Sequence, residues 1–512
     1  MDNVEEKREK LQLRLDAQKT QKERNKMGQY ATPFTLACDI MERLKKLCHG
    51  HTTSLIEPSM GTGAFYSAFL TTFGKKAGHA LGFEIDEHYC NPSKELWKGH
   101  DITIKHDDFL KSVPDDSNLY DMLVANPPYV RHHHIDSSEK ERLRLSVKRE
   151  TGINLSGLAG LYCYFMTLSS KWLKDDGISC WLVPCEFMDV NYGKAVKQYL
   201  IENVDLLQIH RFSPDDSLFS DALVSSCVVI FKNRKPSHTS VTLTTGGSIS
   251  IPSSARTIGR ERLDCGQKWS RLFDEGQDMT KDKGYTIGDF FTVKRGIATG
   301  GNNFFILNEE TVDEYHIPSR FLLPILPSPR YVNCDVIPSG EGGHPIVEKK
   351  LYLFSCSLSE HDIAEYYPGV WQYIQKGKRQ GVDKGYICSR RTPWYSCEER
   401  KPAPFVMPYM GRGETAKRMF RFILNNSDAV TTNVYLLLYP NPDYSSCLKD
   451  EETLNKVWSE LNAIPTEKIA NGGRVYGGGL HKIEPKELMD IPVPQIASIL
   501  LPLQSNRQLS IF

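Results

Sequence analysis

The chain lacks the features that mark membrane, secreted and zinc-binding proteins. No apolar run in its 512 residues approaches the ~20 residues that a membrane-spanning helix needs. Its first residues, Met1–Arg8, do not form the apolar stretch of a signal peptide. Its thirteen cysteines are scattered without a CxxC pair, so the spacing indicates neither a zinc site nor a disulfide framework. These absences predict a reduced, cytoplasmic protein with no metal and no membrane association.

The most informative segment that is present is Asn126-Pro127-Pro128-Tyr129, which follows the apolar run 122–125. A short apolar run that ends in two prolines predicts a buried strand with an abrupt stop. The segment would then hold an amide (Asn126), a carbonyl (Pro127) and an aromatic ring (Tyr129) at the carboxyl end of a strand, where open parallel sheets bind ligands. Two acceptors beside a ring suit a planar group that bears an amino substituent. An ordinary turn with a packed tyrosine is the alternative explanation.

Three segments that contain acidic residues precede Asn126–Tyr129 in the sequence, each at the predicted end of a strand. The first runs from Glu57 and Pro58 into a turn with Gly61 and Gly63, which permit a sharp bend and close approach to a ligand. The turn lacks the three glycines of a dinucleotide fingerprint and the lysine of a P-loop. Glu84 lies about twenty residues further on, the usual place for an acid that binds a ribose diol. Asp108 and Phe109 end the third strand.

Together these segments resemble the S-adenosylmethionine-dependent DNA N6-adenine methyltransferases, specifically the gamma group of type II restriction–modification systems. The resemblance covers residues 27–235 with specific motifs and residues 285–490 more loosely. Its motifs stand, in the order of that group, at 28–33, 57–65, 84, 108–109, 126–129, 160–165, 181–187 and 219–231.

The resemblance implies a reaction and a set of site residues. The reaction is transfer of a methyl group from S-adenosyl-L-methionine to N6 of an adenine flipped out of double-stranded DNA, with Asn126, Pro127 and Tyr129 as catalytic residues. An aromatic at Phe219 would stack on the other face of the base. The residues expected to bind the cofactor are Thr32, Glu57, Pro58, Gly61, Gly63, Glu84, Asp108 and Phe109. A monomer in the prokaryotic cytoplasm, associated with the nucleoid and paired with a cognate restriction endonuclease, is the expected setting.

The chain divides, on its patterns, into five parts. Residues 1–26 are highly charged and predict a single exposed helix or frayed arm. Residues 27–235 alternate strand and helix patterns, which predicts an α/β fold: a Rossmann-like methyltransferase domain with a parallel-type sheet. Within it, 130–158 is polar and predicted to be a loop. Residues 236–284 suggest a connection with short strands, 285–495 an α+β target-recognition domain, and 496–512 a tail.

Contacts with DNA must depend on local charge, because the chain has 63 basic and 63 acidic residues. Residues 376–421 contain twelve Lys or Arg, four Asp or Glu, and six interleaved aromatics. A solvated face above an ordinary core would explain this pattern, but beside the motifs above we favour a surface that contacts phosphates. The residues expected to bind DNA are Arg390, Arg391, Lys417 and Arg418, with Arg474 in a glycine-rich loop as a separate candidate.

Other functions remain open on these residues. The Asn-Pro-Pro-Tyr segment also suits cytosine N4, guanine N2 in RNA, or a glutamine side chain in protein. A non-catalytic DNA-specificity protein on a decayed methyltransferase fold is an alternative of another class. A fused nuclease is not expected, because about 26 residues precede the cofactor motifs.

Overall fold

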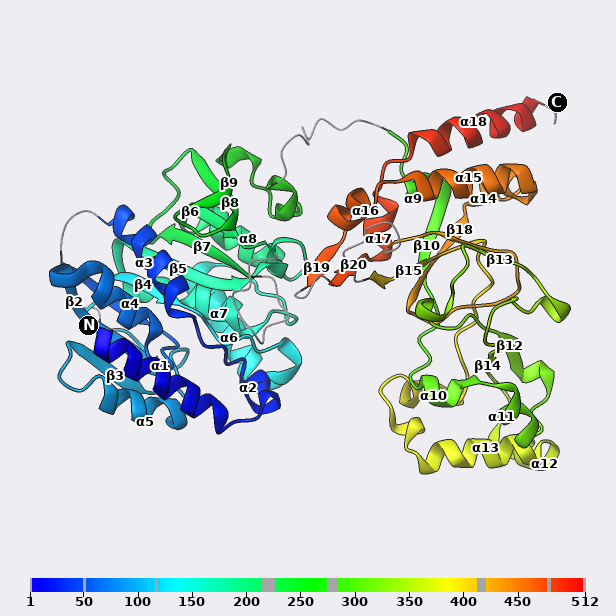
Figure 1. The fold of residues 1–512 in the computed structure, drawn as a ribbon, viewed down its shortest axis with the longest axis horizontal. Helices are drawn as coiled ribbons and strands as arrows, with labels where there is room; N and C mark the ends of the chain where they lie inside the picture. Colours follow the sequence, from blue (N-terminus) through cyan, green and yellow to red (C-terminus); the bar gives the residue numbers. More distant parts are fainter. Residues whose placement is uncertain are drawn as a thin grey trace. The chain divides into compact units, whose positions relative to one another are not determined.

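A computed structural model describes residues 2–48, 52–115, 118–213, 226–273, 284–411, 420–476 and 480–509. The predicted site residues Phe219, Lys417 and Arg418 lie outside these ranges. The chain forms two compact units, residues 1–278 and 279–512, and Figure 1 labels the helices and strands of each. Over the part of the chain that is described, no helix is both long and apolar enough to cross a membrane.

The first unit is built on a nine-stranded sheet, counted over the described residues, in the order β3-β2-β1-β4-β5-β7-β6-β8-β9. Its strands are β1 (Thr53–Glu57), β2 (Ala77–Glu84), β3 (Ile102–His106), β4 (Tyr120–Ala125), β5 (Leu173–Pro184), β6 (Asp205–Arg211), β7 (Ser226–Lys232), β8 (Ser240–Gly247) and β9 (Pro252–Gly259). The first five strands of the order are parallel, as predicted. However, β7 runs antiparallel to both of its neighbours, and β9 antiparallel to β8, so the sheet is mixed.

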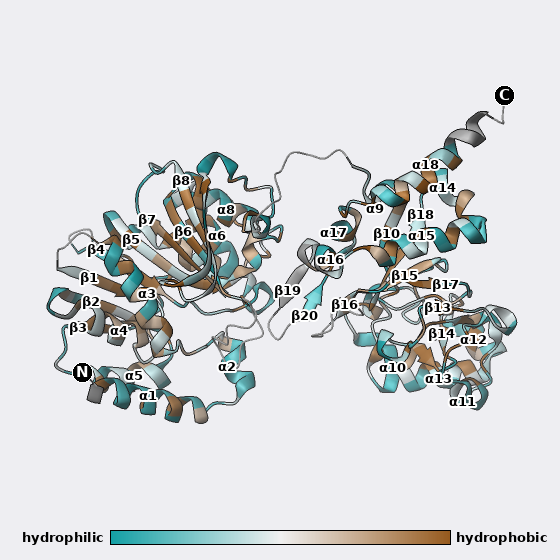
Figure 2. Ribbon diagram, turned by 45° about the horizontal axis from the view of Figure 1, so that its top comes forward, coloured by the Kyte–Doolittle hydropathy of each residue, from teal (hydrophilic) through white to brown (hydrophobic). Residues whose placement is uncertain are grey.

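Alternate residues of the central strands face two different layers of helices, because successive side chains of a strand point to opposite faces. Leu55 and Met122 pack with α3 (Phe34–Leu47) and α4 (Ala64–Phe73). Their neighbours Ile56 and Leu123 pack instead with α6 (Ser137–Thr151), α7 (Leu161–Leu168) and α8 (Gly193–Glu202). Both faces of the sheet are therefore buried, and Figure 2 shows its central strands as hydrophobic.

Three predicted segments differ from the structure. The predicted loop 130–158 contains α6, whose Leu143 and Val147 are buried beneath an otherwise polar surface. The segment 236–284, predicted to be a connection with short strands, supplies β8 and β9, which extend the nine-stranded sheet of the first unit. The N-terminal segment forms two helices, α1 (Asp2–Ala17) and α2 (Gln21–Met27), and α1 packs against α5 (Glu87–Leu96) rather than standing exposed.

The second unit combines three small sheets with short helices, consistent with the predicted α+β class. Among its described residues, the largest sheet has the order β10-β18-β15-β17-β13, the second β11-β14-β12 and the third β16-β20-β19. The strands are β10 (Phe291–Arg295), β11 (Ile306–Leu307), β12 (Leu322–Pro324), β13 (Val336–Ile337), β14 (Tyr352–Phe354), β15 (Phe405–Pro408), β16 (Met410–Gly411), β17 (Ile423–Asn425), β18 (Tyr435–Pro440), β19 (Arg474–Tyr476) and β20 (Leu480–Lys482).

The longer helices of this unit are α12 (Glu360–Tyr366), α13 (Pro368–Arg379), α15 (Glu451–Ala463), α16 (Thr466–Gly472) and α18 (Pro494–Leu509). The shorter ones are α9 (Ile287–Phe290), α10 (Asn302–Phe305), α11 (Glu309–Glu314), α14 (Pro442–Ser445) and α17 (Pro485–Met489). The prediction of a tail at residues 496–512 is also wrong, because α18 occupies most of this segment. Ile496 and Leu500 of this helix are buried in the core around β10 and β18.

Candidate active site

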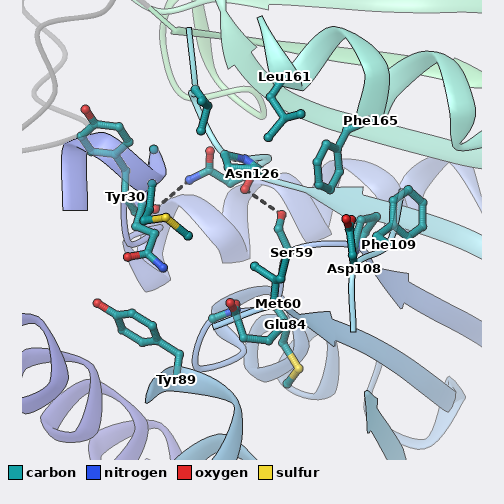
Figure 3. A pocket seen from close by; sticks show the side chains of 18 of the residues that line it. Tyr30, Ser59, Met60, Glu84, Tyr89, Asp108, Phe109, Asn126, Leu161 and Phe165 are labelled. Atoms are coloured by element: carbon teal, nitrogen blue, oxygen red, sulfur yellow. Dashed lines mark hydrogen bonds between the residues drawn. The ribbon is translucent and has the colours of Figure 1, made fainter. Parts of the chain in front are cut away.

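A cavity of about 730 Å³ lies at the carboxyl ends of β1, β2, β3 and β4. The chain leaves β1 towards β2 and β3 on one side and returns to β4 on the other side, so the loops after β1 and β4 diverge there. Open α/β sheets bind ligands at such a switch point. The volume is within the ~300–1,000 Å³ range of small-molecule sites. The sequence motifs therefore converge on one cavity, whose lining Figure 3 shows.

The glycine turn after β1 is tied to the acid at the end of β2. Gly61 and Gly63 adopt positive φ angles of 55° and 86°, which side-chain-bearing residues rarely adopt. The Gly61 amide donates a 2.8 Å hydrogen bond to Glu84 Oε2, and the Asp86 amide donates another of 2.8 Å to Glu84 Oε1. Burial raises the pKa of Glu84. Each carboxylate oxygen still has lone-pair capacity for a ligand hydroxyl, so Glu84 both fixes the turn and faces the cavity.

Glu57 is the second acid of the cavity, and the less satisfied one. Its side chain is 3% exposed, and among the described residues its Oε2 has no hydrogen-bond partner. Burial raises the pKa of Glu57 well above its ordinary value. A buried carboxylate without a partner is costly and favours a donor or a cation at that place. The amino-acid end of S-adenosylmethionine carries an ammonium group, so this orphaned oxygen fits the cofactor that the motifs imply.

The Asn126 amide has one defined orientation. Its Nδ2 donates to the carbonyl oxygen of Tyr30 (3.0 Å) and to Thr32 Oγ1 (3.1 Å). A backbone carbonyl only accepts hydrogen bonds, so the NH₂ group must face Tyr30. Both amide hydrogens are thereby used, and Oδ1 has no protein partner among the described residues. The backbone oxygen of Asn126 accepts a 2.9 Å bond from Ser59 Oγ, which fixes the segment from below (Figure 3).

Pro127 and Tyr129 do not line the cavity, although their neighbours Asn126 and Pro128 do. The Tyr129 hydroxyl donates to the carbonyl oxygen of Leu182 (3.1 Å), its ring lies 5.6 Å from the ring of Tyr30, and burial raises its pKa. Gly28 is pressed against the same segment: a Cβ on Gly28 would lie 2.4 Å from the Tyr129 nitrogen. The backbone at Gly28 thus packs directly on the segment Asn126–Tyr129.

The far end of the cavity is more apolar than the motifs indicated. Asp108 Oδ1 accepts from the Leu110 amide (2.9 Å), so it caps the local turn, and Phe109 is 2% exposed and stacks on Phe165 at 5.6 Å. Ile85, which is 56% exposed, also lines this cavity. Ile85 was not among the residues predicted to line the site. Its signal is an exposed aliphatic residue directly after an acid-tipped strand, a surface suited to a planar ring.

The predicted DNA-binding residues that the structure describes lie in different surroundings in the second unit. Arg390 is exposed, stacks on Tyr386 at 3.6 Å and donates to the Tyr386 carbonyl oxygen (2.8 Å). Arg391 instead donates to the carbonyl oxygens of Ala298 (2.5 Å) and Thr299 (2.9 Å), so it holds a glycine-rich loop. Arg474 lies in β19, paired with β20.

The aromatic residues interleaved in the basic segment are mostly core residues. Trp394, Tyr395, Phe405, Tyr409 and Phe420 are each at most 9% exposed, whereas Tyr386 is 76% exposed. The alternative explanation, an ordinary core beneath the charged residues, therefore applies to five of the six aromatic residues. Arg379, Lys384 and Arg390 remain as exposed cations near Tyr386 in sequence.

The histidines 132–134 form a single 3-10 turn. Among the described residues, no group of three His, Cys, Asp or Glu side chains is arranged to hold a metal ion.

The fold of the first unit is the Rossmann-like fold of S-adenosylmethionine-dependent methyltransferases, and the cavity lies where that fold binds ligands. Comparison with known families agrees. The Eco57I restriction-modification methylase family matches residues 66–219, and the type II methyltransferase M.Eco57I C-terminal domain matches residues 274–509. The chain belongs to the family of type II restriction–modification methyltransferases.

Individual relatives match almost the whole chain. Type II methyltransferase M.AccI of Acinetobacter calcoaceticus is 26% identical, over 91% of this chain and 85% of that protein. Type II methyltransferase M.XamI of Xanthomonas campestris pv. amaranthicola is 25% identical, over 92% and 86%. The solved structure of the type IIL restriction–modification enzyme MmeI in complex with DNA has a TM-score of 0.56 at 12% identity. It matches 89% of this chain, which spans 64% of that longer chain, and the likeness is one of fold.

Proposed function

We propose that the chain transfers a methyl group from S-adenosyl-L-methionine to N6 of an adenine flipped out of double-stranded DNA. The observation that carries this proposal is the fixed Asn126 amide, whose oxygen is left to accept from a ligand beside the cavity. An amino-bearing base is the ligand that such an acceptor suits, and the motif order along the chain favours adenine in DNA.

The chemistry asked of the protein is to make a weak nucleophile reactive. The lone pair of an exocyclic amino group is delocalised into the ring. Hydrogen bonds from the amino group to Asn126 Oδ1 and to the Pro127 carbonyl oxygen favour a pyramidal nitrogen and localise that lone pair. Both bonds strengthen as positive charge develops on the nitrogen, so they stabilise the transition state more than the bound substrate.

The cofactor, when bound, supplies an electrophilic methyl group. Glu57 would pair with its ammonium group, Glu84 would accept from its ribose, and Ile85 with Phe109 would contact its adenine ring. Asp108 would accept from the adenine amino group, while Thr32 and Pro58 would lie beside the methionine portion. The turn at Gly61 and Gly63 would let the backbone approach. Holding the methyl donor beside the amino group supplies proximity.

The target atom is inaccessible inside a duplex, so the adenine must leave the stack, at a cost of a few kcal/mol. Stacking on Tyr129 and Phe219 would offset that cost, at roughly 1–3 kcal/mol for each contact. Arg390, with Lys417 and Arg418, would contact phosphates, Arg474 would reach the groove, and Arg391 would support the loop beside them. The solved complex of MmeI with DNA supports DNA as the substrate of this chain.

We infer a setting from the family. The protein would act as a monomer in the prokaryotic cytoplasm, at the nucleoid, and protect DNA from a cognate restriction endonuclease.

The test is single-molecule sequencing of plasmid DNA from a host that expresses the protein, with an Asn126→Ala host as the control. N6-methyladenine at one fixed sequence, absent from the control, is the expected result. N4-methylcytosine at a fixed sequence would show that the target base is cytosine and not adenine, while the chain would still be a DNA methyltransferase. Unmodified DNA together with methylated RNA or protein glutamine would overturn the proposal. DNA binding with no transfer to any of these acceptors would point to a specificity protein.

A further inference from the structure

The N-terminal helix α1 is polar, yet it is docked on the cofactor loops. Arg8 is 3% exposed, although it carries a charge. Its guanidinium pairs with Glu5 and donates to Thr62 Oγ1 (3.0 Å), and Thr62 in turn donates to Gln12 Oε1 (2.7 Å). Thr62 lies between the two glycines of the turn after β1. The helix is therefore attached to the turn through a buried polar network.

The carboxylate of Asp16 continues this network one turn further along α1. Its Oδ1 accepts two hydrogen bonds, from the Tyr89 hydroxyl (2.7 Å) and from Gln12 Nε2 (2.9 Å). Its Oδ2 has no protein partner among the described residues. Asp16, Gln12 and Tyr89 all line the cavity, and Figure 3 shows Tyr89 on the same side of it as Glu84. The Asp16 carboxylate is thus fixed through Oδ1, and its Oδ2 is left to accept a hydrogen bond from a ligand in the cavity.

The segment after α1 is attached to the ribose-binding side as well. Lys19 forms an ion pair with Asp86, which also accepts a 2.7 Å bond from Gln29 Nε2. Burial alone would raise the pKa of Asp86, but the bonds from Lys19 and Gln29 lower it. Asp86 stands two residues after Glu84 and donates its amide to that carboxylate. The chain from α1 to the motif at 28–33 is therefore tied to the loop that ends β2.

We propose that Asp16 is a second acid of the cofactor site, which accepts from the ribose diol together with Glu84, while Gln12 and Tyr89 are positioning residues. This inference rests on the proposed function. The reason for a second acceptor is that both Glu84 oxygens already bind backbone amides. A diol presents two donors, and a carboxylate oxygen that is free of such bonds accepts more strongly. The N-terminal helix is then part of the binding site.

The test uses the full chain and S-adenosylhomocysteine, measured by calorimetry. Asp16→Asn keeps the size and the Oδ1 acceptor but replaces the second oxygen with a donor, so affinity should fall about ten-fold or more. The matched control is Glu6→Gln, the same change of charge on the exposed side of α1. Glu6→Gln should bind like wild type. An Asp16→Asn affinity within two-fold of wild type would overturn the inference.

A second measurement separates contact from structural support. Methylthioadenosine and its 2′,3′-dideoxy analogue are compared on each variant. Wild type should prefer the diol, and Asp16→Asn should lose much of this preference, whereas mere disruption of α1 would weaken both ligands alike. Tyr89→Phe, which removes one bond to Oδ1, should reduce the preference by a smaller factor. If wild type itself binds none of these ligands, the proposed function fails as well as the inference.

Discussion

The orientation of the Asn126 amide gives the sharpest prediction. Replacing Asn126 with alanine removes the acceptor oxygen but neither the cavity nor its acidic residues. Loss of one preorganised group that stabilises developing charge typically costs about 2.7–4 kcal/mol, or roughly 10²–10³ in kcat. We expect a loss of this size in methyl transfer, with binding of S-adenosylhomocysteine and of DNA largely intact, because the oxygen acts mainly in the transition state.

Thr32 tests whether the orientation itself matters. Thr32→Val removes one of the two acceptors of the amide NH₂ group, while the Tyr30 carbonyl remains. Asn126 is half-buried, so water can replace the lost partner, and the cost is that of one ordinary hydrogen bond, about 1 kcal/mol or roughly five-fold in rate. Thr32→Ser keeps the hydroxyl and is the matched control, with an expected rate close to wild type.

The assay is single-turnover transfer of a labelled methyl group to unmethylated plasmid DNA, with enzyme in excess. Binding of S-adenosylhomocysteine is measured in parallel by calorimetry, because Thr32 also lines the cofactor cavity. For Thr32→Val, the rate should fall by a larger factor than the affinity. Transfer by Asn126→Ala within three-fold of wild type would show that the amide oxygen is not the acceptor. Equal rates for the Val and Ser variants would show that Thr32 does not orient it.

Three other predictions concern the cofactor, the DNA and the flipped base. Burial raises the pKa of Glu57, so binding of S-adenosylmethionine should release a proton from this carboxyl group, and the affinity should increase as pH rises through that pKa. Calorimetry in buffers of different ionisation enthalpy measures the proton release. Glu57→Gln should abolish it. Removing Lys384 and Arg390 together should weaken binding to all duplexes and flatten its salt dependence, whereas removing Lys456, an exposed cation of α15, should not. Tyr129→Phe should retain most methyl transfer, because the Tyr129 hydroxyl is bonded to a backbone carbonyl oxygen and not to the base. Tyr129→Ala should lose methyl transfer and alter the fluorescence of 2-aminopurine at the target position. Equal methyl transfer by the two variants would refute stacking of the base on Tyr129.

The parts of the site that could be predicted from sequence are those set by short-range pattern. An apolar run followed by an acid, a glycine turn or two prolines fixes where a strand ends and which side chain stands there. Because consecutive strands are parallel, their ends meet, and Glu57, Glu84 and Asn126 converge as expected.

What could not be predicted depends on partners far apart in the sequence. Residues 1–26 are highly charged and contain few apolar residues, so their pattern indicated an exposed helix or a frayed arm. However, Arg8 is buried against Thr62, 54 residues away, and no local pattern records that contact. The same holds for α6, where two buried residues, Leu143 and Val147, suffice to dock an otherwise polar helix. The antiparallel direction of β7 likewise leaves no mark in its own apolar sequence.

The basic segment shows how an aromatic pattern can mislead. Aromatics among cations are typical of nucleic-acid surfaces, and also of core strands that lie next to charged residues. Phe405 and Tyr409 are of the second kind, because every residue of β15 is buried and Tyr409 directly after it is 2% exposed. The sequence could not separate these cases, because the strands that pair with β15 at Phe405 are β17 and β18, which lie further along the chain.

The division of the apolar core has a thermodynamic consequence. Among the described residues, each of the five core clusters draws its members from one unit alone, two from the first and three from the second. Melting one unit therefore does not expose the core of the other. A calorimetric trace of the whole chain should resolve into two endotherms, and its total enthalpy should exceed the van't Hoff enthalpy of a single transition. Cofactor should raise the midpoint of one endotherm and leave the other in place.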